Sequence, residues 1–452
     1  MIVGLIAVAA RLFFVANLAA AGNEAGLNDN AGDARQYIAL ARNLAEFGTF
    51  IDDSPGGRAA GSTYFSLLRP PIYPALAAPF EARDARAALF YVQAIIGGAI
   101  PMFAAFLAGI WFRSRPAAWL AGLMAALSPT GIGITGQVMA DQLFATLFAA
   151  SIVAVAVSVR STRRASRWMW IAGVAAGLAT LVKPAGLYWP LVLPVLAWIF
   201  ARAASSRVRW RPVAIAVAIG LILPAMWAVR NYRVAGVFRV STVDAQNLRY
   251  YLAPQAQEWA REGDIPTKAK LKRNRERTMR RDTDDAATLT PREIVRRQWS
   301  ESVAIFRTHP AETFRAYMHN LRGHLTTPFN GFDYQFPKGG TTRRMMGRLE
   351  QMTGSTAAYW LIGVLSLASL LPLLVGADRR DPTWRMRIIS VAAIMLIFGY
   401  VAGLSGTTYG TGSRILFPAH IAVQLLMAAG VAALGRDLPR ILRRHAIASR
   451  AA

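Results

Sequence analysis

Ionisable residues in this largely apolar chain have the types that proton transfer and phosphate binding require. An aspartate carboxylate accepts a proton from a hydroxyl group, and arginine or lysine side chains bind phosphate oxygens. Each of these residues borders an apolar stretch, in "NAGDARQYIALARNL", "RPPIYP", "MADQLF", "LVKPAG", "WAVRNY" and "YGTGSRILFP", which hold Asp33, Arg69, Asp141, Lys183, Arg230 and Arg414. Arg11 is the exception because it lies within an apolar stretch, and we expect an internal ion pair for it.

The composition places these residues in a membrane protein. The chain is 54% hydrophobic and 17% charged, whereas soluble domains carry about 25% charged residues. Apolar stretches of about 20 residues recur, which is the length that a bilayer core requires. Hydropathy predicts an all-α polytopic protein with about ten spans, near 2–21, 88–112, 117–134, 138–159, 168–182, 185–201, 212–230, 357–376, 386–404 and 414–434.

The loops between spans predict the orientation. Alternate short loops are basic, such as "RSTRRASR" (160–167) and "RAASSRVRWR" (202–211), so both termini are expected in the cytoplasm. This distribution explains the net charge of +26, and nucleic-acid binding is not expected. The ionisable residues named above, except Arg11, are then expected at the outer, non-cytoplasmic face of the membrane. A cleaved signal peptide is disfavoured because Arg11 interrupts the first apolar stretch and no basic region precedes it.

Three parts are predicted: an N-terminal membrane half (1–230) with a first outer loop (22–87), an outer segment (231–356), and C-terminal spans with a basic tail (357–452). Residues 261–297 are dense in charge and typical of a solvated or flexible loop. Residues 291–325 predict two helices broken at Pro310, with apolar residues at helical spacing among basic ones. These helices suit either the membrane surface or a small packing module.

Local patterns leave two interpretations open for each of the two main candidates. Two prolines after Arg69 suit the first turn of a helix, whose free N–H groups favour an anion, but an arginine there also reaches lipid headgroups. Asp33 lies just before a helix pattern that ends at Gly48, so it is either a general base or an N-cap.

Taken in order, the motifs resemble those of bacterial GT-C glycosyltransferases, such as protein O-mannosyltransferases and the aminoarabinose transferase of lipid A. The resemblance rests on "GDARQYIALARNLAEFG", "RPPIYP", "MADQLF", "KPAG", "RNY…G.F..ST" (230–242) and "SRILFPAHIAVQLL". It covers essentially the whole chain as an ordered series. It implies a GT-C fold of about ten transmembrane helices with outer-face amphipathic helices in the first and fourth outer loops. It also implies a bacterial inner membrane as the location, with the active site at the periplasmic face.

The resemblance also implies roles for particular residues. Asp33 matches the family's catalytic base, and Arg69 matches the residue that binds the carrier phosphate, a lysine in the aminoarabinose transferase. Arg414 and Lys183 are further candidates for the phosphate, and Asp141, Tyr37, Arg230 and Asn231 are candidates for substrate binding, with Asp141 also a second acid. Two features depart from the family: these enzymes often have Asp-Glu where this chain has Asp33-Ala34, and the outer segment 231–356 differs from the C-terminal domains of some relatives.

The expected function is transfer of a sugar from a polyprenyl-phosphate carrier to a hydroxyl group, with inversion at the sugar carbon. The acceptor is a glycan, a lipid or a protein, and anionic phospholipids are expected partners. No cofactor is required, although the acids would also suit a divalent metal. With no cysteine, disulfides and thiolate metal sites are excluded. The alternatives are a transporter or flippase, with polar groups at mid-depth, and a transferase of phospho-groups from a lipid-linked donor.

Overall fold

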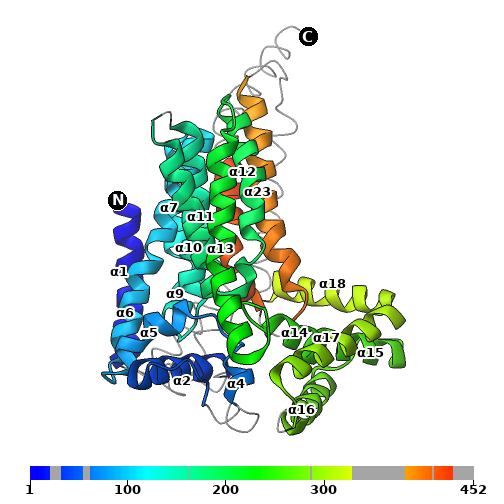
Figure 1. Cartoon of the computed structure of the whole chain (residues 1–452). Coiled ribbons are helices and arrows are strands. Elements are labelled where there is room, and N and C mark those ends of the chain that lie inside the picture. The colour runs from blue at the N-terminus through cyan, green and yellow to red at the C-terminus, as the bar shows by residue number, and fades with distance from the viewer. Residues whose placement is uncertain are drawn as a thin grey trace.

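The computed structural model describes residues 1–20, 32–53, 62–161, 163–285, 288–327, 382–409 and 412–430. Every regular element in these ranges is a helix, which confirms the predicted all-α class. The long helices run side by side in a bundle, and a group of helices projects sideways from one of its ends (Figure 1). The bundle comprises α1 (Ile2–Ala20), α6 (Arg86–Gly97), α7 (Ala99–Phe112), α8 (Arg115–Ala126), α9 (Pro129–Thr135), α10 (Asp141–Arg160), α11 (Ala165–Val182), α12 (Trp189–Ala203), α13 (Trp210–Ala235) and α23 (Pro382–Ser405).

Small residues let these helices approach closely. A Cβ atom on Gly173 of α11 would lie 2.4 Å from the carbonyl oxygen of Ala216 on α13, so only glycine fits there. Such contacts stabilise helix pairs in lipid, where hydrophobic burial between helices contributes little. Phe148 and Trp189 are fully buried and pack at 4.2 Å between ring centroids, which joins α10 to α12.

The expected spans correspond to these helices to different degrees. Within the described residues, five helices are long and apolar enough to cross a membrane: Ile2–Ala20, Arg86–Phe112, Asp141–Arg160, Ala165–Val182 and Trp210–Ala235. The expected 117–134 span consists of α8 and α9, which are bent by 43° to each other. Trp189–Ala203, Ile389–Ser405 and Arg414–Gly430 are apolar but shorter, and the expected 357–376 span lies outside the described residues.

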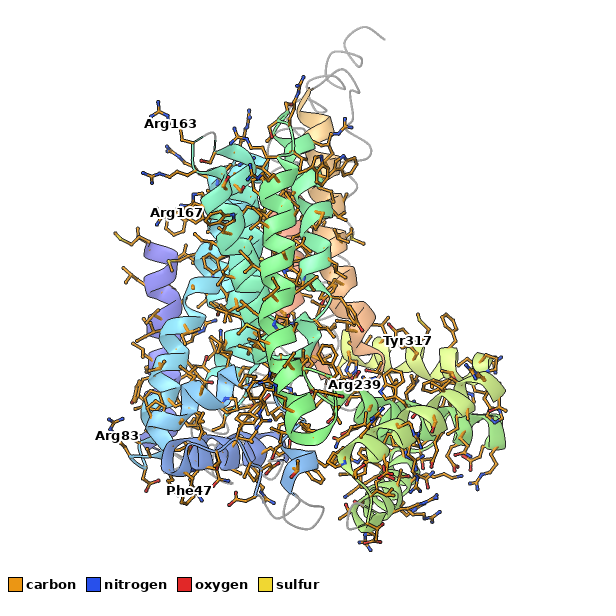
Figure 2. All side chains as sticks on the ribbon, in the orientation of Figure 1. Phe47, Arg83, Arg163, Arg167, Arg239 and Tyr317 are labelled. Atoms are coloured by element: carbon orange, nitrogen blue, oxygen red, sulfur yellow. The ribbon has the colours of Figure 1, made fainter. Side chains whose placement is uncertain are left out.

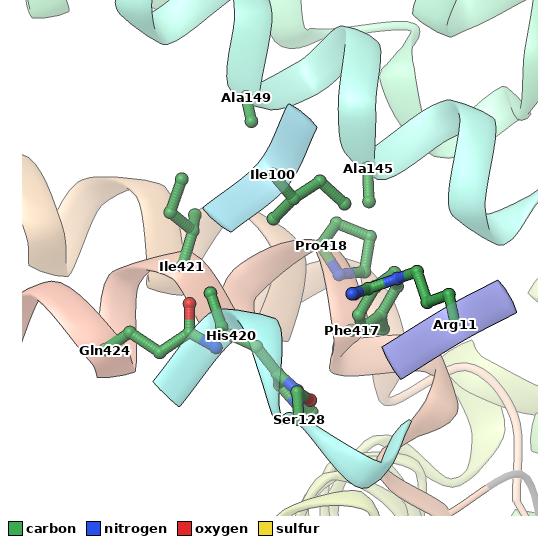
Figure 3. A pocket seen from close by; sticks show the side chains of 11 residues that line it. Arg11, Ile100, Ser128, Ala145, Ala149, Phe417, Pro418, His420, Ile421 and Gln424 are labelled. Atoms are coloured by element: carbon green, nitrogen blue, oxygen red, sulfur yellow. The ribbon is translucent and has the colours of Figure 1, made fainter. Parts of the chain in front are cut away.

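Arg11 stabilises the break between α8 and α9. Its Nη1 donates to the carbonyl of Ala7 at 3.1 Å and to the carbonyl of Ala126 at 3.2 Å. Ala126 is the last residue of α8, and the dipole of a helix favours a cation at that end. Its partners in the described part of the chain are therefore carbonyls, in place of the expected ion pair. Arg11 also borders a cavity of about 10 Å³, the size of one water molecule, together with Ser128, His420 and Gln424 (Figure 3).

The helices at one end of the bundle come from the two expected outer segments. The first contributes α2 (Gly32–Phe47), α4 (Ser62–Phe65) and α5 (Ile72–Glu81). The second contributes the outer module, which consists of α14 (Val243–Asn247), the π-helix η2 (Leu248–Leu252), α15 (Ala253–Glu262), α16 (Lys268–Asp285), α17 (Pro291–Thr308) and α18 (Pro310–Thr326). The predicted break at Pro310 is confirmed, because α17 ends at Thr308 and α18 begins at Pro310.

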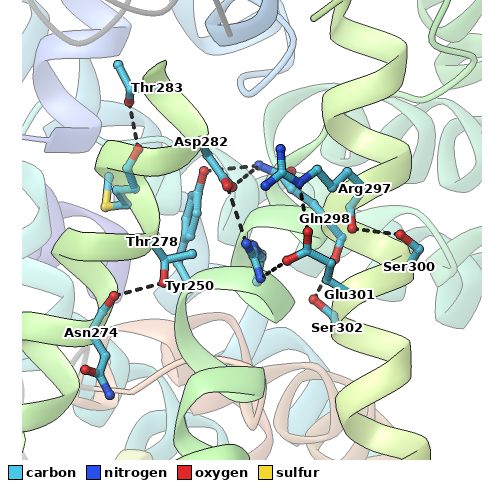
Figure 4. A network of polar contacts seen from close by, with 12 residues as sticks. Tyr250, Asn274, Thr278, Asp282, Thr283, Arg297, Gln298, Ser300, Glu301 and Ser302 are labelled. Atoms are coloured by element: carbon cyan, nitrogen blue, oxygen red, sulfur yellow. Dashed lines mark hydrogen bonds and ion pairs between the residues drawn. The ribbon is translucent and has the colours of Figure 1, made fainter. Parts of the chain in front are cut away.

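The prediction of a solvated loop over 261–297 is wrong. Residues 268–285 form α16, since lysine, arginine and glutamate are good helix formers and Leu271 and Asp282 are buried. Asp282 accepts from Gln298 of α17 at 3.2 Å and pairs with Arg249 of η2 at 3.5 Å (Figure 4). Arg249 also pairs with Glu301 at 2.6 Å. This buried network holds α16 against the rest of the outer module.

The two ends of the bundle differ in the loops that they carry. The basic residues Arg163 and Arg167 lie at the end opposite to Phe47 and Arg83 (Figure 2). Arg163 lies between α10 and α11, and Arg167 lies in the first turn of α11. Helices α2, α4 and α5 and the outer module lie at the Phe47 end (Figure 1). The basic 160–167 loop and the outer segments thus occupy opposite ends, in agreement with the arrangement expected from the loops.

Candidate active site

Asp33 is shared between two arginines that come from distant parts of the chain. Its Oδ1 accepts from Arg69 Nη2 at 2.5 Å, and its Oδ2 accepts from Arg414 Nη2 at 3.2 Å. Asp33 lies in the first turn of α2, which begins at Gly32, so it is one residue inside the helix where we expected it just before. Its charge is favoured there by the helix dipole. Of its side-chain surface, 36% is exposed, so a ligand can reach the carboxylate.

Arg69 is held by contacts from the same face of α2. Its Nε donates to Gln36 Oε1 at 2.8 Å, and its guanidinium lies 5.1 Å from the centroid of the Tyr37 ring. Asp33, Gln36 and Tyr37 are spaced i, i+3 and i+4, which places them on one side of the helix. The two prolines that follow Arg69 were expected in the first turn of a helix. They instead precede α5, which begins at Ile72.

Arg414 closes the other side of the carboxylate. It lies in the 3₁₀ helix η3 (Gly412–Ala419), and 20% of its side-chain surface is exposed. Its Nη1 also contacts Met139 Sδ at 3.3 Å, in the turn that precedes α10. Arg414 therefore joins the last described helix to both the first outer loop and the start of α10.

Asp141 and Lys183 form a second ion pair nearby. Lys183 Nζ donates to Asp141 Oδ1 at 2.7 Å. Asp141 is the first residue of α10, and Lys183 directly follows the last residue of α11, so two antiparallel helices place both side chains at one end of the bundle. The side chain of Asp141 is only 5% exposed and that of Lys183 is 21% exposed, so Lys183 is the more accessible of the pair.

The electrostatics of the cluster favour an anion. Burial raises the pKa of Asp33, but the nearby guanidinium groups of Arg69 and Arg414 outweigh burial and hold that pKa well below its usual range. Counting three cations (Arg69, Arg414, Lys183) against two carboxylates (Asp33, Asp141) leaves one excess positive charge. Burial raises the pKa of Tyr37 to about 12, so this phenol adds no charge at neutral pH. A ligand with a single negative charge would balance the cluster.

Two of the sequence candidates make other contacts. Arg230 lies 4.8 Å from the Trp227 ring centroid and donates to the carbonyl of Phe50 at 3.4 Å. Asn231 donates to the carbonyls of Arg239 at 2.8 Å and Val240 at 3.4 Å. Asn231 therefore organises the segment that follows α13, whereas Arg230 joins α13 to the first outer loop.

Sequence reasoning missed neutral residues that support the cluster. Gln36 and Met139 contact its arginines directly. Tyr73 packs edge-on against Tyr37 at 4.8 Å between centroids and donates to Gln93 Oε1 at 2.9 Å. The i, i+3 spacing from Asp33 would have identified Gln36, whereas Met139 and Tyr73 carry no signal that separates them from ordinary core residues. Among the described residues, no group of three His, Cys, Asp or Glu converges as a metal site would require.

Comparisons with known proteins give distant similarities. The model of a family described as predicted membrane proteins (DUF2142) matches residues 72–268, less than half of the chain. No curated protein matches. The chain is similar to the oligosaccharyltransferase AglB from Archaeoglobus fulgidus, solved with an inhibitory peptide and a dolichol-phosphate, at 14% identity and a TM-score of 0.46 over 97% of this chain and 52% of that one. It thus spans about half the length of AglB.

The chain is also similar to ArnT from Cupriavidus metallidurans. The likeness to the structure bound to undecaprenyl phosphate has 16% identity and a TM-score of 0.39, and the likeness to the apo structure has 15% identity and a TM-score of 0.35. Each covers 94% of this chain and 77% of that one.

Proposed function

We propose that this protein is a membrane glycosyltransferase that moves a sugar from a polyprenyl-phosphate carrier to a hydroxyl group. The observation that carries the proposal is the accessible carboxylate of Asp33 between Arg69 and Arg414, at the end of the bundle opposite the basic 160–167 loop. A carboxylate beside two guanidinium groups provides both a base and a binding site for the phosphate. The excess charge of one matches a phosphodiester, which carries a single negative charge.

The reaction requires one bond to form while another breaks. The acceptor oxygen attacks the anomeric carbon and gives its proton to Asp33, and the bond between that carbon and the carrier phosphate breaks. The bonding electrons leave with the phosphate, whose new charge is stabilised by Arg69 and Arg414. Direct displacement inverts the anomeric carbon, and holding both substrates at one level supplies much of the rate.

Binding of the carrier would also activate the base. In the structure both oxygens of Asp33 are occupied by arginines. A phosphate that takes over these N–H groups releases the carboxylate, whose pKa then rises because the burial that raises it is no longer outweighed. Asp33 would become a stronger base only when the donor is present.

The pH dependence of kcat/KM for the donor tests the electrostatic coupling of Asp33 to Arg69, on which this activation depends. This quantity reports groups of the free enzyme. Asp33 must be ionised, so activity is lost as the pH falls through its pKa, and the lowered pKa places that loss well below neutral pH. We expect Arg69→Ala to move the acidic limb to higher pH, since it removes the strongest influence that lowers the pKa. An acidic limb at the same pH in both proteins would contradict the proposed coupling.

We further propose that the Asp33 end of the bundle faces the periplasm of a bacterial inner membrane, with both termini in the cytoplasm. The separation of Arg163 and Arg167 from the outer helices supports this orientation.

A reconstituted assay with a polyprenyl-phosphate-linked sugar tests the function. Release of free carrier phosphate that depends on the protein supports it, and no release with any prenyl-linked sugar tested would count against it.

Anionic phospholipids are proposed partners of α18. Its polar side contacts the end of α23 and the residues that follow: Tyr317 donates to the Gly403 carbonyl, Asn320 donates to the Gly406 carbonyl at 3.2 Å, and the His324 ring bonds the Thr408 carbonyl at 2.8 Å. Its apolar stripe is exposed, with 65% of Phe314 and 42% of Met318 accessible. This stripe therefore lies at the rim of the bundle.

The position and the charges of the stripe favour a lipid surface. Phe314, Met318 and Leu325 are spaced i, i+4 and i+11, so they follow one side of the helix. Arg315 and Arg322 are exposed beside them, where they can reach headgroup phosphates. In contrast, α17 buries Ile294, Val295 and Gln298 within the protein. Of the two interpretations that the sequence left open, packing fits α17 and the membrane surface fits α18.

Because the chain has no cysteine, a single introduced cysteine can report on α18. We expect a polarity-sensitive probe on Met318→Cys to show a blue-shifted emission in vesicles with anionic lipid. The matched control is Lys272→Cys on α16, where 68% of the side chain is exposed, and its probe should emit as in water. Equal emission from both sites would exclude contact between α18 and the bilayer.

A further inference from the structure

The segment that follows α13 contacts the backbone just before Arg69. Ser241 Oγ donates to the carbonyl of Leu68 at 2.6 Å, and the backbone N–H of Thr242 donates to the carbonyl of Leu67 at 3.1 Å. Ser241 and Thr242 are buried, with 6% and 0% of their surfaces exposed. The two residues before Arg69 are therefore held by hydrogen bonds that water cannot replace.

The same segment is itself anchored to the end of α13. Asn231 donates to the carbonyls of Arg239 and Val240, which directly precede Ser241. The chain reverses at Gly236, whose φ of +68° is a left-handed conformation that glycine adopts without strain. Val240 packs with Leu181 and Ala228 of the bundle. Residues 231–242 thus connect a membrane helix to the backbone of the first outer loop.

On its other side, Arg69 is fixed by proline. Pro70 and Pro71 have restricted φ angles, and a residue before proline is confined to extended conformations. The backbone around Arg69 is therefore constrained from both directions: by accepted hydrogen bonds at Leu67 and Leu68, and by ring geometry at Pro70 and Pro71. The guanidinium of Arg69 therefore contacts Asp33 and Gln36 from a backbone position that is fixed.

We propose that Ser241 is a positioning residue for Arg69, which acts through the carbonyl of Leu68 and sets the place where the donor phosphate is bound. The inference rests on the proposed function, because it assumes that Arg69 binds that phosphate. It assigns a role to the "RNY…G.F..ST" stretch: Asn231 anchors the segment, Gly236 turns it, and Ser241 with Thr242 holds the chain before Arg69. Ser241 touches no substrate in this scheme.

The outer module contacts the same place. Tyr64 of α4 donates to Gln298 Oε1 of α17 at 2.9 Å, and Gln246 of α14 donates to the Tyr64 hydroxyl at 3.3 Å. Tyr64 and Leu67 pack in one buried cluster with Val237 and Ile294. Side chains of the module therefore support α4 while Ser241 and Thr242 hold the residues that follow it.

The test compares the donor dependence of full-length Ser241→Ala, Ser241→Thr and wild type in a prenyl-phosphate-sugar transfer assay. Removing one buried hydrogen bond that positions a charged ligand-binding group should raise the KM for the donor about tenfold. The kcat should change much less, because Asp33 is untouched. Ser241→Thr keeps the hydroxyl group and should restore most of the wild-type KM.

The matched control is Ser302→Ala, since Ser302 is also fully buried and donates to a backbone carbonyl, that of Gln298, at 2.6 Å. A donor KM for Ser241→Ala equal to that of wild type, or a rise of the same size in Ser302→Ala, would overturn the positioning role. Arg69→Ala, assayed in parallel, separates the two claims. If Arg69→Ala lacks a donor effect, the proposed function fails; if it has one and Ser241→Ala does not, only this inference fails.

Discussion

Replacing Asp33 by asparagine is expected to abolish sugar transfer while donor binding persists. Asparagine has the same shape but cannot accept the acceptor's proton, and general bases contribute about 10²–10⁴-fold to rate. The two arginines lose their carboxylate partner, so their N–H groups become free for a phosphate. We therefore expect kcat to fall by that factor and the affinity for prenyl phosphate to stay equal or increase. Single-turnover transfer and binding of the carrier lipid, measured on the same preparation, provide the two numbers.

The control for this variant is Asp244→Asn. Asp244 pairs with Arg239 at 2.6 Å but lies outside the cluster, with 48% of its side chain exposed. It should retain wild-type turnover. Unchanged turnover in Asp33→Asn would contradict the assignment of Asp33 as the base. If Asp33→Asn turns over normally but binds less donor, Asp33 is a binding residue instead.

Replacing Arg69 by alanine is expected to cause the largest loss of donor binding. Its guanidinium supplies charge-assisted hydrogen bonds, each of which contributes about 1.5–3 kcal/mol. Losing them predicts that the donor concentration needed for half-maximal rate rises by about 10–100-fold or more. Arg69→Lys keeps the charge but cannot donate in the same forked geometry, so its effect should be intermediate. Donor titrations of the three proteins give this order directly.

Arg86→Ala is a suitable control because it also removes a paired arginine, at the start of the bundle helix α6. Arg86 donates to both oxygens of Glu81 at 2.6 Å, away from Asp33. We expect it to lower thermal stability without changing donor dependence. Equal donor dependence of Arg69→Ala and wild type would exclude a phosphate-binding role for Arg69, whatever the stability of the variant.

The sequence predicted at which end of the bundle the charged residues lie better than it predicted which residues they contact. That Asp33, Arg69 and Arg414 meet follows in part from the alternation of basic loops, which places all three at the same end. Hydropathy gives the depth of a residue but not the rotation of its helix. It therefore could not show that Asp141 pairs with Lys183 or that Arg230 donates to the carbonyl of Phe50.

The outer module shows where local composition misleads. The charge density of residues 268–285 suggested a solvated segment, yet α16 is held by partners that are distant in sequence. Arg249 and Gln298 meet the buried Asp282, and Lys270 pairs with Glu258 at 2.8 Å. A charged helix is stable there because its partners come from η2, α15 and α17, which lie outside the charged stretch itself.

The sharing of Asp33 between two arginines has a consequence for selectivity in a lipid environment. Ordinary phospholipids surround the protein at high local concentration, and unpaired guanidinium groups at headgroup level would bind their phosphates. Asp33 is a tethered competitor for Arg69 and Arg414, so a phosphate alone must displace a carboxylate that never diffuses away. A ligand with further contacts through its sugar or prenyl chain can offset that cost, whereas a bulk lipid cannot. The empty site would thus resist occupation by the membrane's most abundant anions.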